Sequence, residues 1–137
     1  MTKLPKHRNA RPELILGPLP VEGLNLTLGL DLSLGLVVLS PAAQKHAATR
    51  HPEDYPRLLP HIATIVSNPL YVGDDFHNDQ KIELIGTSVG LEGFGLVAVS
   101  IQKNTLGNYH VVSFYPVSRD KINKRREKGF LQIFKTK

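Results

Sequence analysis

Three apolar segments follow one another in the second half of the chain: KIELI at 81–85, LVAVSI at 96–101 and YHVVSFY at 109–115. Val, Ile, Phe and Tyr are frequent in them, and stretches that contain glycine or asparagine separate them. This pattern is typical of consecutive strands joined by turns. Pro116 ends the third segment, because proline removes a hydrogen-bond donor from a sheet. We therefore predict an antiparallel meander over these segments.

Two helices are predicted before the meander. Ser40 is a favourable N-cap, and Pro41 suits the first position of a helix that ends before Pro52. A second helical segment is expected over 55–67, where apolar residues recur on one face. Pro60 either kinks this segment or starts its second part.

Leucine occupies every even position from 24 to 36, and polar or small residues occupy the odd positions. This strict period-2 alternation predicts a half-buried strand. Because such a strand is unusually long, we expect a bend or turn near residues 29–31.

After the meander, a short basic helix is expected over 118–128, with Gly129 as its C-cap and a closing strand over 130–134. The order of elements predicts an α+β fold, in which N-terminal helices pack against a twisted antiparallel β-sheet of four to five strands. Residues 13–137 are expected to form a single domain, preceded by a flexible basic arm at 1–12.

The 137-residue chain contains no cysteine, which excludes disulfides, thiolate zinc sites and a cysteine nucleophile. Neither a membrane-spanning segment nor a signal peptide is evident, so we expect a cytoplasmic protein. The net charge of +5 is unevenly distributed: residues 1–12 carry +4, residues 13–118 carry −5 and residues 119–137 carry +6. A basic end on an acidic body indicates a surface that binds polyanions.

The first predicted helix carries candidates for acid–base chemistry on phosphate esters. His46 and Arg50 lie four residues apart on one helical face, and His51 falls at the end of the helix. Imidazole titrates near neutral pH, and guanidinium binds phosphate through a planar fork. The acidic loop at 74–79 lacks the glycine and the terminal glutamate of an EF-hand loop, so we expect neither a metal site nor a cofactor.

Three parts of the sequence together resemble the phage-associated branch of the barnase–EndoU–colicin–RelE-like nuclease superfamily. They are the segment 38–52 with its histidines, the segment 62–72 with its Asn-Pro-Leu-Tyr-Val turn, and the strand 111–116. The resemblance covers roughly residues 15–135. It implies a metal-independent ribonuclease of the toxin or effector type, which cleaves RNA, often tRNA, by attack of the 2′-hydroxyl on the adjacent phosphate.

Four positions match the catalytic positions of such domains: His46, His51, Ser113 and Tyr115. Ser113 stands where a threonine is common, and the hydroxyl is retained. We expect His51 to act as general base or general acid, with His46 as its partner or as the residue that orients it. Ser113 and Tyr115 are two residues apart on one strand face, so both can donate hydrogen bonds to a phosphate.

Basic residues are the expected contacts to the RNA. Arg50 is a candidate phosphate clamp, and the C-terminal group would hold or guide flanking phosphates: Arg119, Lys121, Lys124, Arg125 and Arg126. An acidic immunity protein or antitoxin is the partner expected of a toxin with this surface. Two alternatives remain open, a nucleic-acid-binding module without catalysis and a phage interaction domain whose nuclease fold is vestigial.

Overall fold

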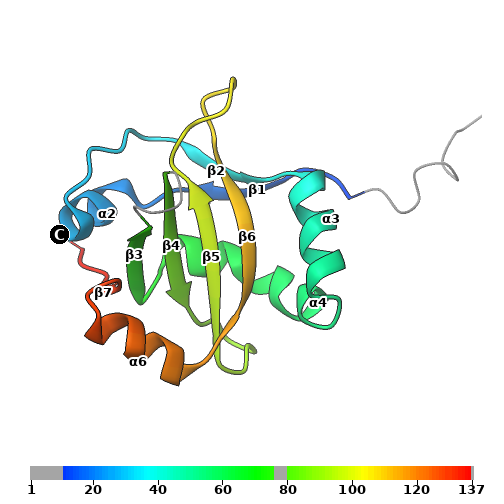
Figure 1. Cartoon of the computed structure of the whole chain (residues 1–137). Coiled ribbons are helices and arrows are strands. Elements are labelled where there is room, and N and C mark those ends of the chain that lie inside the picture. Colours follow the sequence, from blue (N-terminus) through cyan, green and yellow to red (C-terminus); the bar gives the residue numbers. More distant parts are fainter. Residues whose placement is uncertain (1–10, 76–79, 137) are drawn as a thin grey trace, which may run out of the picture.

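The structure is a computed structural model that describes residues 11–75 and 80–136, so most of the arm expected at 1–12 lies outside the described residues. These residues form one mixed sheet in the strand order β1-β2-β6-β5-β4-β3-β7 (Figure 1). The strands are β1 (Leu14–Pro18), β2 (Leu36–Leu39), β3 (Tyr71–Asp75), β4 (Lys81–Gly86), β5 (Phe94–Ser100), β6 (Tyr109–Val117) and β7 (Gln132–Ile133). The helices are α2 (Val21–Leu28), α3 (Pro41–Arg50), α4 (Asp54–Leu58), the 3-10 turn η1 (Leu59–His61), α5 (Ile62–Ser67) and α6 (Arg119–Glu127).

The α+β class is confirmed, but the sheet of the described residues has seven strands instead of the expected four to five. It is also mixed, because β2 runs parallel to β6, with Val37 opposite Tyr109. The outer edge of β6 presents backbone groups that need partners, and β2 and then β1 extend the sheet there. The sequence did not predict β1, because Gly17 and Pro18 are tolerated at a sheet edge but are not typical of strands.

The predicted meander is confirmed as β4, β5 and β6, and both N-terminal helical segments form. Pro116 does not end the third strand as expected, because β6 continues through it to Val117, opposite Phe94. Ser40 caps α3, and its Oγ accepts a hydrogen bond of 3.1 Å from the N–H of Ala43. The second helical segment is divided into α4, η1 and α5, with Pro60 inside η1. Gly129 follows α6 with a φ of +81°, as expected of a helix end, whereas the closing strand predicted over 130–134 is reduced to β7. No helix within the described ranges is long and apolar enough to cross a membrane.

The strand predicted from the leucine repeat at 24–36 is wrong, because its first part is the helix α2 and only its last residue enters β2. Leu24 and Leu28 are four residues apart, so the repeat also satisfies the period of a helix that buries one face. The Asn25 side chain binds both backbone groups of Leu32, at 2.8 and 3.1 Å. This side chain holds the segment after α2 against the helix, so that it does not extend as a strand.

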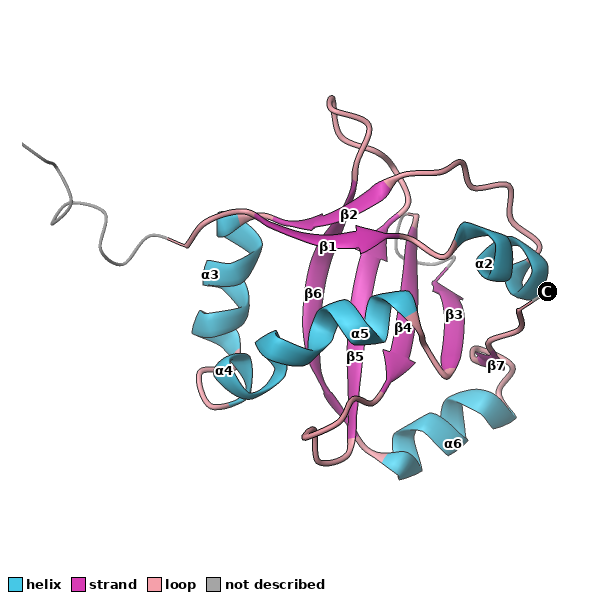
Figure 2. Cartoon of the chain, turned by 180° about the vertical axis from the view of Figure 1, so that it is seen from behind, coloured by secondary structure: helices cyan, strands magenta, loops and turns pink. Residues whose placement is uncertain are grey.

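The larger hydrophobic core lies on the side of the sheet that α2, α4 and α5 cover. Figure 2 shows α5 crossing this side of the strands. Ile62, Ile65 and Val66 of α5 are at most 1% exposed, and they belong to the same buried cluster as the apolar residues of β4, β5 and β6. Burial of one sheet face in this way makes the register of these strands specific.

The opposite side of the sheet has a smaller core, built from Ile85, Leu96, Ala98, Val117, Ile122 and Leu131. Of these residues, Ile122 lies in α6 and Leu131 in the segment that leads to β7. Figure 1 shows that α6 crosses only one end of this side, and the remainder of the sheet face is left without a covering helix. We refer to this uncovered part of the sheet as the open face.

The segment after α6 approaches the sheet closely at Gly73 of β3. A Cβ atom at this position would clash with the carbonyl oxygen of Phe130 and would lie 2.9 Å from Cδ2 of Leu131. Because the first of these neighbours is backbone, rotation of a side chain cannot relieve the clash. Gly86 of β4 is a matched contrast, since the nearest atoms to a Cβ there lie 3.6 Å away.

We expect Gly73→Ala to lower the free energy of unfolding by about 1–3 kcal/mol, as overpacking does in other cores. Gly86→Ala should change it by less than about 1 kcal/mol, because its surroundings already accept a methyl group. Urea denaturation of the two variants and the wild type measures both values. Equal stability of the two variants would contradict the close packing of the C-terminal segment on β3.

Candidate active site

The open face of the sheet carries rows of side chains that the strand register brings together. Glu83 of β4 lies opposite Ala98 of β5, and Ala98 lies opposite Ser113 of β6. In the next row, Leu96 lies opposite Tyr115. Since adjacent strands are about 4.8 Å apart, Glu83 and Ser113 stand about 10 Å apart with only the methyl group of Ala98 between them. The small side chain of Ala98 therefore lies between the polar side chains of Glu83 and Ser113, and we call this position the floor of the site.

His51 reaches this face from the C-terminal end of α3. Its backbone N–H caps the helix by donating to the carbonyl of Ala47, and Pro52 turns the chain away. The imidazole is half-buried, and its ring centroid lies 5.9 Å from that of Tyr115. The chain therefore places a histidine, Tyr115 and Ser113 at the same side of β6.

The position of His51 depends on a buried polar network around Gln44 of α3, which is 2% exposed. Its Nε2 donates to the carbonyl oxygens of Pro12 and Leu39, at 2.6 and 3.3 Å, and its Oε1 accepts from the Tyr55 hydroxyl at 3.2 Å. Tyr55 in turn packs against Phe114 of β6, with 5.9 Å between ring centroids. Because a buried amide without partners is costly, this network ties α3 and α4 to the sheet.

Glu83 was absent from the candidates that the sequence suggested. Its carboxylate forms an ion pair with the guanidinium of Arg125, and the two side chains are only 16% and 29% exposed. The alternation in KIELI contained a signal, because it sets Glu83 on the face opposite the buried Ile82 and Leu84. An acidic residue in that position is also typical of the solvent-facing side of a strand. Only the contact with α6 shows that Glu83 is a partly buried ion-pair partner and not an exposed surface residue.

The predicted basic residues of α6 divide into two groups. Arg119 and Arg126 stack on aromatic rings of the sheet, Arg119 at 4.5 Å from the centroid of Phe94 and Arg126 at 5.1 Å from that of Tyr71. Arg119 also donates a hydrogen bond of 3.2 Å to the Tyr71 hydroxyl. These contacts hold planar guanidinium groups beside the open face with further N–H donors available.

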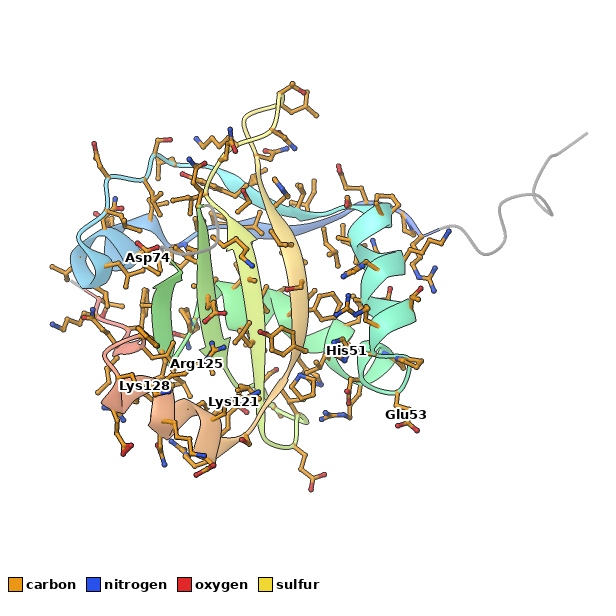
Figure 3. All side chains as sticks on the ribbon, viewed as in Figure 1. His51, Glu53, Asp74, Lys121, Arg125 and Lys128 are labelled. Carbon is orange, nitrogen blue, oxygen red and sulfur yellow. The ribbon has the colours of Figure 1, made fainter. Side chains whose placement is uncertain are left out.

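The remaining predicted basic residues of α6 are oriented differently from one another. Figure 3 shows Lys121 and Arg125 extending from α6 over the open face, with His51 on the other side of β6. Lys124 forms an ion pair of 3.3 Å with Asp120, and both side chains are largely exposed. An exposed pair of this kind contributes little to stability, so Lys124 can exchange its partner for a phosphate.

The structure does not bring His46 and Arg50 to His51 and Tyr115. Both side chains are exposed on α3, and neither makes a hydrogen bond, ion pair or ring contact with another described residue. Residues four apart lie on one side of a helix, so His46 and Arg50 share an exposed surface of α3.

The arrangement combines groups that move protons with groups that bind anions. The Glu83 carboxylate and the Ser113 hydroxyl flank Ala98, and the His51 imidazole lies beside Tyr115 in the next row. Guanidinium and ammonium groups of α6 extend over the same face. Such a set can exchange protons with two oxygens of a phosphodiester and can stabilise the negative charge between them. Within residues 11–75 and 80–136, no group of three histidine, cysteine or acidic side chains is placed to hold a metal ion.

Comparison with known proteins gives one family. A model described as phage-Barnase-EndoU-ColicinE5/D-RelE like nuclease3 matches residues 16–124, which include His51, Glu83, Ser113 and Tyr115. No curated protein and no solved structure matches significantly. The resemblance inferred from the sequence is confirmed, and the family supports a nuclease function with nucleic acid as the substrate class. The chain belongs to the phage-Barnase-EndoU-ColicinE5/D-RelE like nuclease3 family.

Proposed function

We propose that this protein is a ribonuclease that cleaves RNA by attack of the 2′-hydroxyl on the adjacent phosphate, without a catalytic metal ion. The supporting observation is that His51 lies beside Tyr115 at one side of the open face, while the Glu83 carboxylate lies two strands away across Ala98. Transesterification needs a base for the 2′-hydroxyl and an acid for the leaving 5′-oxygen, and Glu83 and His51 supply these two groups at one face of the sheet.

In the proposed mechanism, Glu83 accepts the proton of the 2′-hydroxyl as its oxygen attacks phosphorus. The bond from phosphorus to the 5′-oxygen then breaks, and His51 donates a proton to that leaving oxygen. The products are a 2′,3′-cyclic phosphate and a free 5′-hydroxyl. His46 then has a supporting role, in which it contacts the RNA together with Arg50 on the exposed side of α3.

The charge that develops on the phosphate is matched by donors around the floor. Ser113 and Tyr115 offer hydroxyl groups from β6, and Lys121 and Arg125 extend over the same face from α6. Arg125 uses part of its guanidinium for Glu83, and its other N–H groups remain for a phosphate oxygen. These cations supply the electrostatic stabilisation that a metal ion supplies in other nucleases.

We further propose that the enzyme acts as a toxin or effector on cellular RNA, tRNA included. The supporting observation is the concentration of positive charge in residues 119–137, which carry +6. An acidic immunity protein or antitoxin would bind this surface and exclude RNA from the open face, since complementary charge favours fast and specific association.

Purified protein is expected to cleave single-stranded RNA in the presence of EDTA and to leave 2′,3′-cyclic phosphate ends. RNA with a 2′-deoxy sugar at the cleaved position should remain intact, because it lacks the nucleophile. Gel electrophoresis and mass spectrometry of the products measure both results. Cleavage that requires added Mg²⁺, or cleavage at the deoxy sugar, would contradict the mechanism, and salt-sensitive binding without cleavage would favour the binding module.

His51→Ala is expected to lower kcat/KM about 10²–10⁴-fold, the usual contribution of a general acid or base. His46→Ala should cost less than about tenfold, because the His46 side chain is exposed, whereas His51 is half-buried beside Tyr115. Initial rates on one RNA substrate give the comparison, and circular dichroism checks that both variants fold. Equal losses in the two variants would overturn the separate roles proposed for the two histidines.

Glu83→Gln is expected to lower kcat about 10²–10⁴-fold while binding of uncleavable RNA is retained, because the amide keeps the shape but cannot accept the proton. Glu92→Gln, in an exposed position outside the strands, is the matched control and should leave kcat unchanged. Thermal unfolding of Glu83→Gln separates a catalytic effect from loss of the contact with Arg125. If kcat of Glu83→Gln falls only in proportion to the fraction of protein that is unfolded, the result would contradict a role of Glu83 as the base.

A further inference from the structure

A groove of about 620 Å³ lies between α6 and β7, beyond the residues placed in the proposed chemistry. Asn123 and Arg126 of α6 form one wall, and Gln132 and Ile133 of β7 form the other. The groove is open to solvent, and Leu131 contributes to its lining. Its volume is in the range of small-molecule sites, which makes it large enough for a nucleotide.

The lining combines the three kinds of group that bind an unpaired nucleotide. Ile133 is 55% exposed and offers an apolar surface to the face of a base. The side-chain amides of Asn123 and Gln132 can donate to and accept from base edges. Two basic residues, Arg126 and Lys135, also line the groove, against one acidic residue among the described lining residues, Glu127, so the lining is net positive.

The groove and the open face are separated by α6. Ile122 of this helix is fully buried in one cluster with Ile85 of β4, so no ligand can pass beneath the helix. Arg126 lines the groove and also stacks on the Tyr71 ring. A strand of nucleic acid that leaves the region of Ala98 must therefore cross the exposed surface of α6 before it reaches Arg126 and the groove.

The distance from the floor of the site to the groove is too long for one nucleotide to span. From β6 to β7 the sheet spans four strand spacings, which is about 19 Å at about 4.8 Å each. A stacked strand rises about 3.4 Å per nucleotide, so a ligand that reaches both places contains several nucleotides. A dinucleotide at the floor between Glu83 and Ser113 would not reach the groove.

We propose that the groove between α6 and β7 is a subsite for an unpaired nucleotide of single-stranded RNA, several nucleotides from the cleaved bond. Its base packs on Ile133 and meets the amides of Asn123 and Gln132, and its phosphate binds Arg126 and Lys135. This inference rests on the proposed ribonuclease function. It adds that the enzyme selects single-stranded substrates long enough to cross the sheet.

The test measures binding and cleavage separately. Fluorescence anisotropy with 2′-O-methyl oligonucleotides of two and eight residues gives affinities that do not depend on cleavage, because these probes lack the nucleophile. Rates of cleavage of unmodified RNA of the same two lengths give kcat/KM. The variants are Arg126→Gln, Lys135→Gln and Ile133→Thr in the groove, and Lys45→Gln on exposed α3 is the control that also removes one positive charge.

The wild type is expected to bind the eight-residue probe more tightly than the two-residue probe. Each groove variant that removes a charge should weaken binding of the long probe about threefold to fivefold, the range of an exposed charge contact, and should leave the short probe unaffected. Ile133→Thr should act in the same direction, and a duplex of the same sequence should bind less tightly than the single strand. Lys45→Gln should leave the ratio of the two affinities unchanged.

Equal effects of the groove variants on both lengths, or no effect on either, would overturn the subsite whether or not the RNA is cleaved. Cleavage that is lost on His51→Ala but shows no length dependence would leave the ribonuclease proposal intact and reject the subsite. Absence of cleavage with a length-dependent effect of Arg126→Gln on binding would support the subsite and reject the ribonuclease mechanism. Circular dichroism of each variant shows that the comparison is made on folded protein.

Discussion

The candidate site depends on the pairing of β6, because this strand is hydrogen-bonded along both of its edges and so connects the His51 side of the site with the Glu83 side. The strand runs antiparallel to β5 on one side and parallel to β2 on the other. α3 and α4 also pack against it, and the contact between Tyr55 and Phe114 carries the end of α3 to the sheet. Since His51 lies at that end and Tyr115 lies on β6, one strand aligns the imidazole with the hydroxyl groups.

A β-bulge in β6 determines which side chains reach the open face. Val111 lies opposite Val99 and Ser113 lies opposite Ala98, so Val112 has no partner on β5. In a regular strand, Val111 and Ser113 would point to the same side. The extra residue separates them, with Val111 in the larger core and Ser113 on the open face. Bulges often redirect a side chain beside an active site, and this one has that effect.

The cover that α6 provides over the sheet is mostly polar. Ile122 is its one buried residue within the described helix. Its polar contacts with the sheet include the Glu83–Arg125 ion pair, two guanidinium groups stacked on aromatic rings, and the hydrogen bond from Arg119 to the Tyr71 hydroxyl. The same cations that attach the helix to the sheet are therefore available to a polyanion at its margin. Close packing at Gly73 brings the following segment onto β3, and the groove next to β7 results from that approach.

The sequence by itself determined most of the local elements and suggested several residues of the candidate site. The N-cap Ser40, the C-cap glycine Gly129 and the alternation in the meander act through neighbouring backbone groups, so α3, α6 and β4–β6 were predictable. Only the tertiary structure decided between helix and strand for the leucine repeat, which satisfies both periods. It also decided the parallel pairing of β2 with β6 and the contact of Glu83 with Arg125, 42 residues away. These features depend on long-range contacts that no local pattern contains, because their free energy appears only when distant segments pack together.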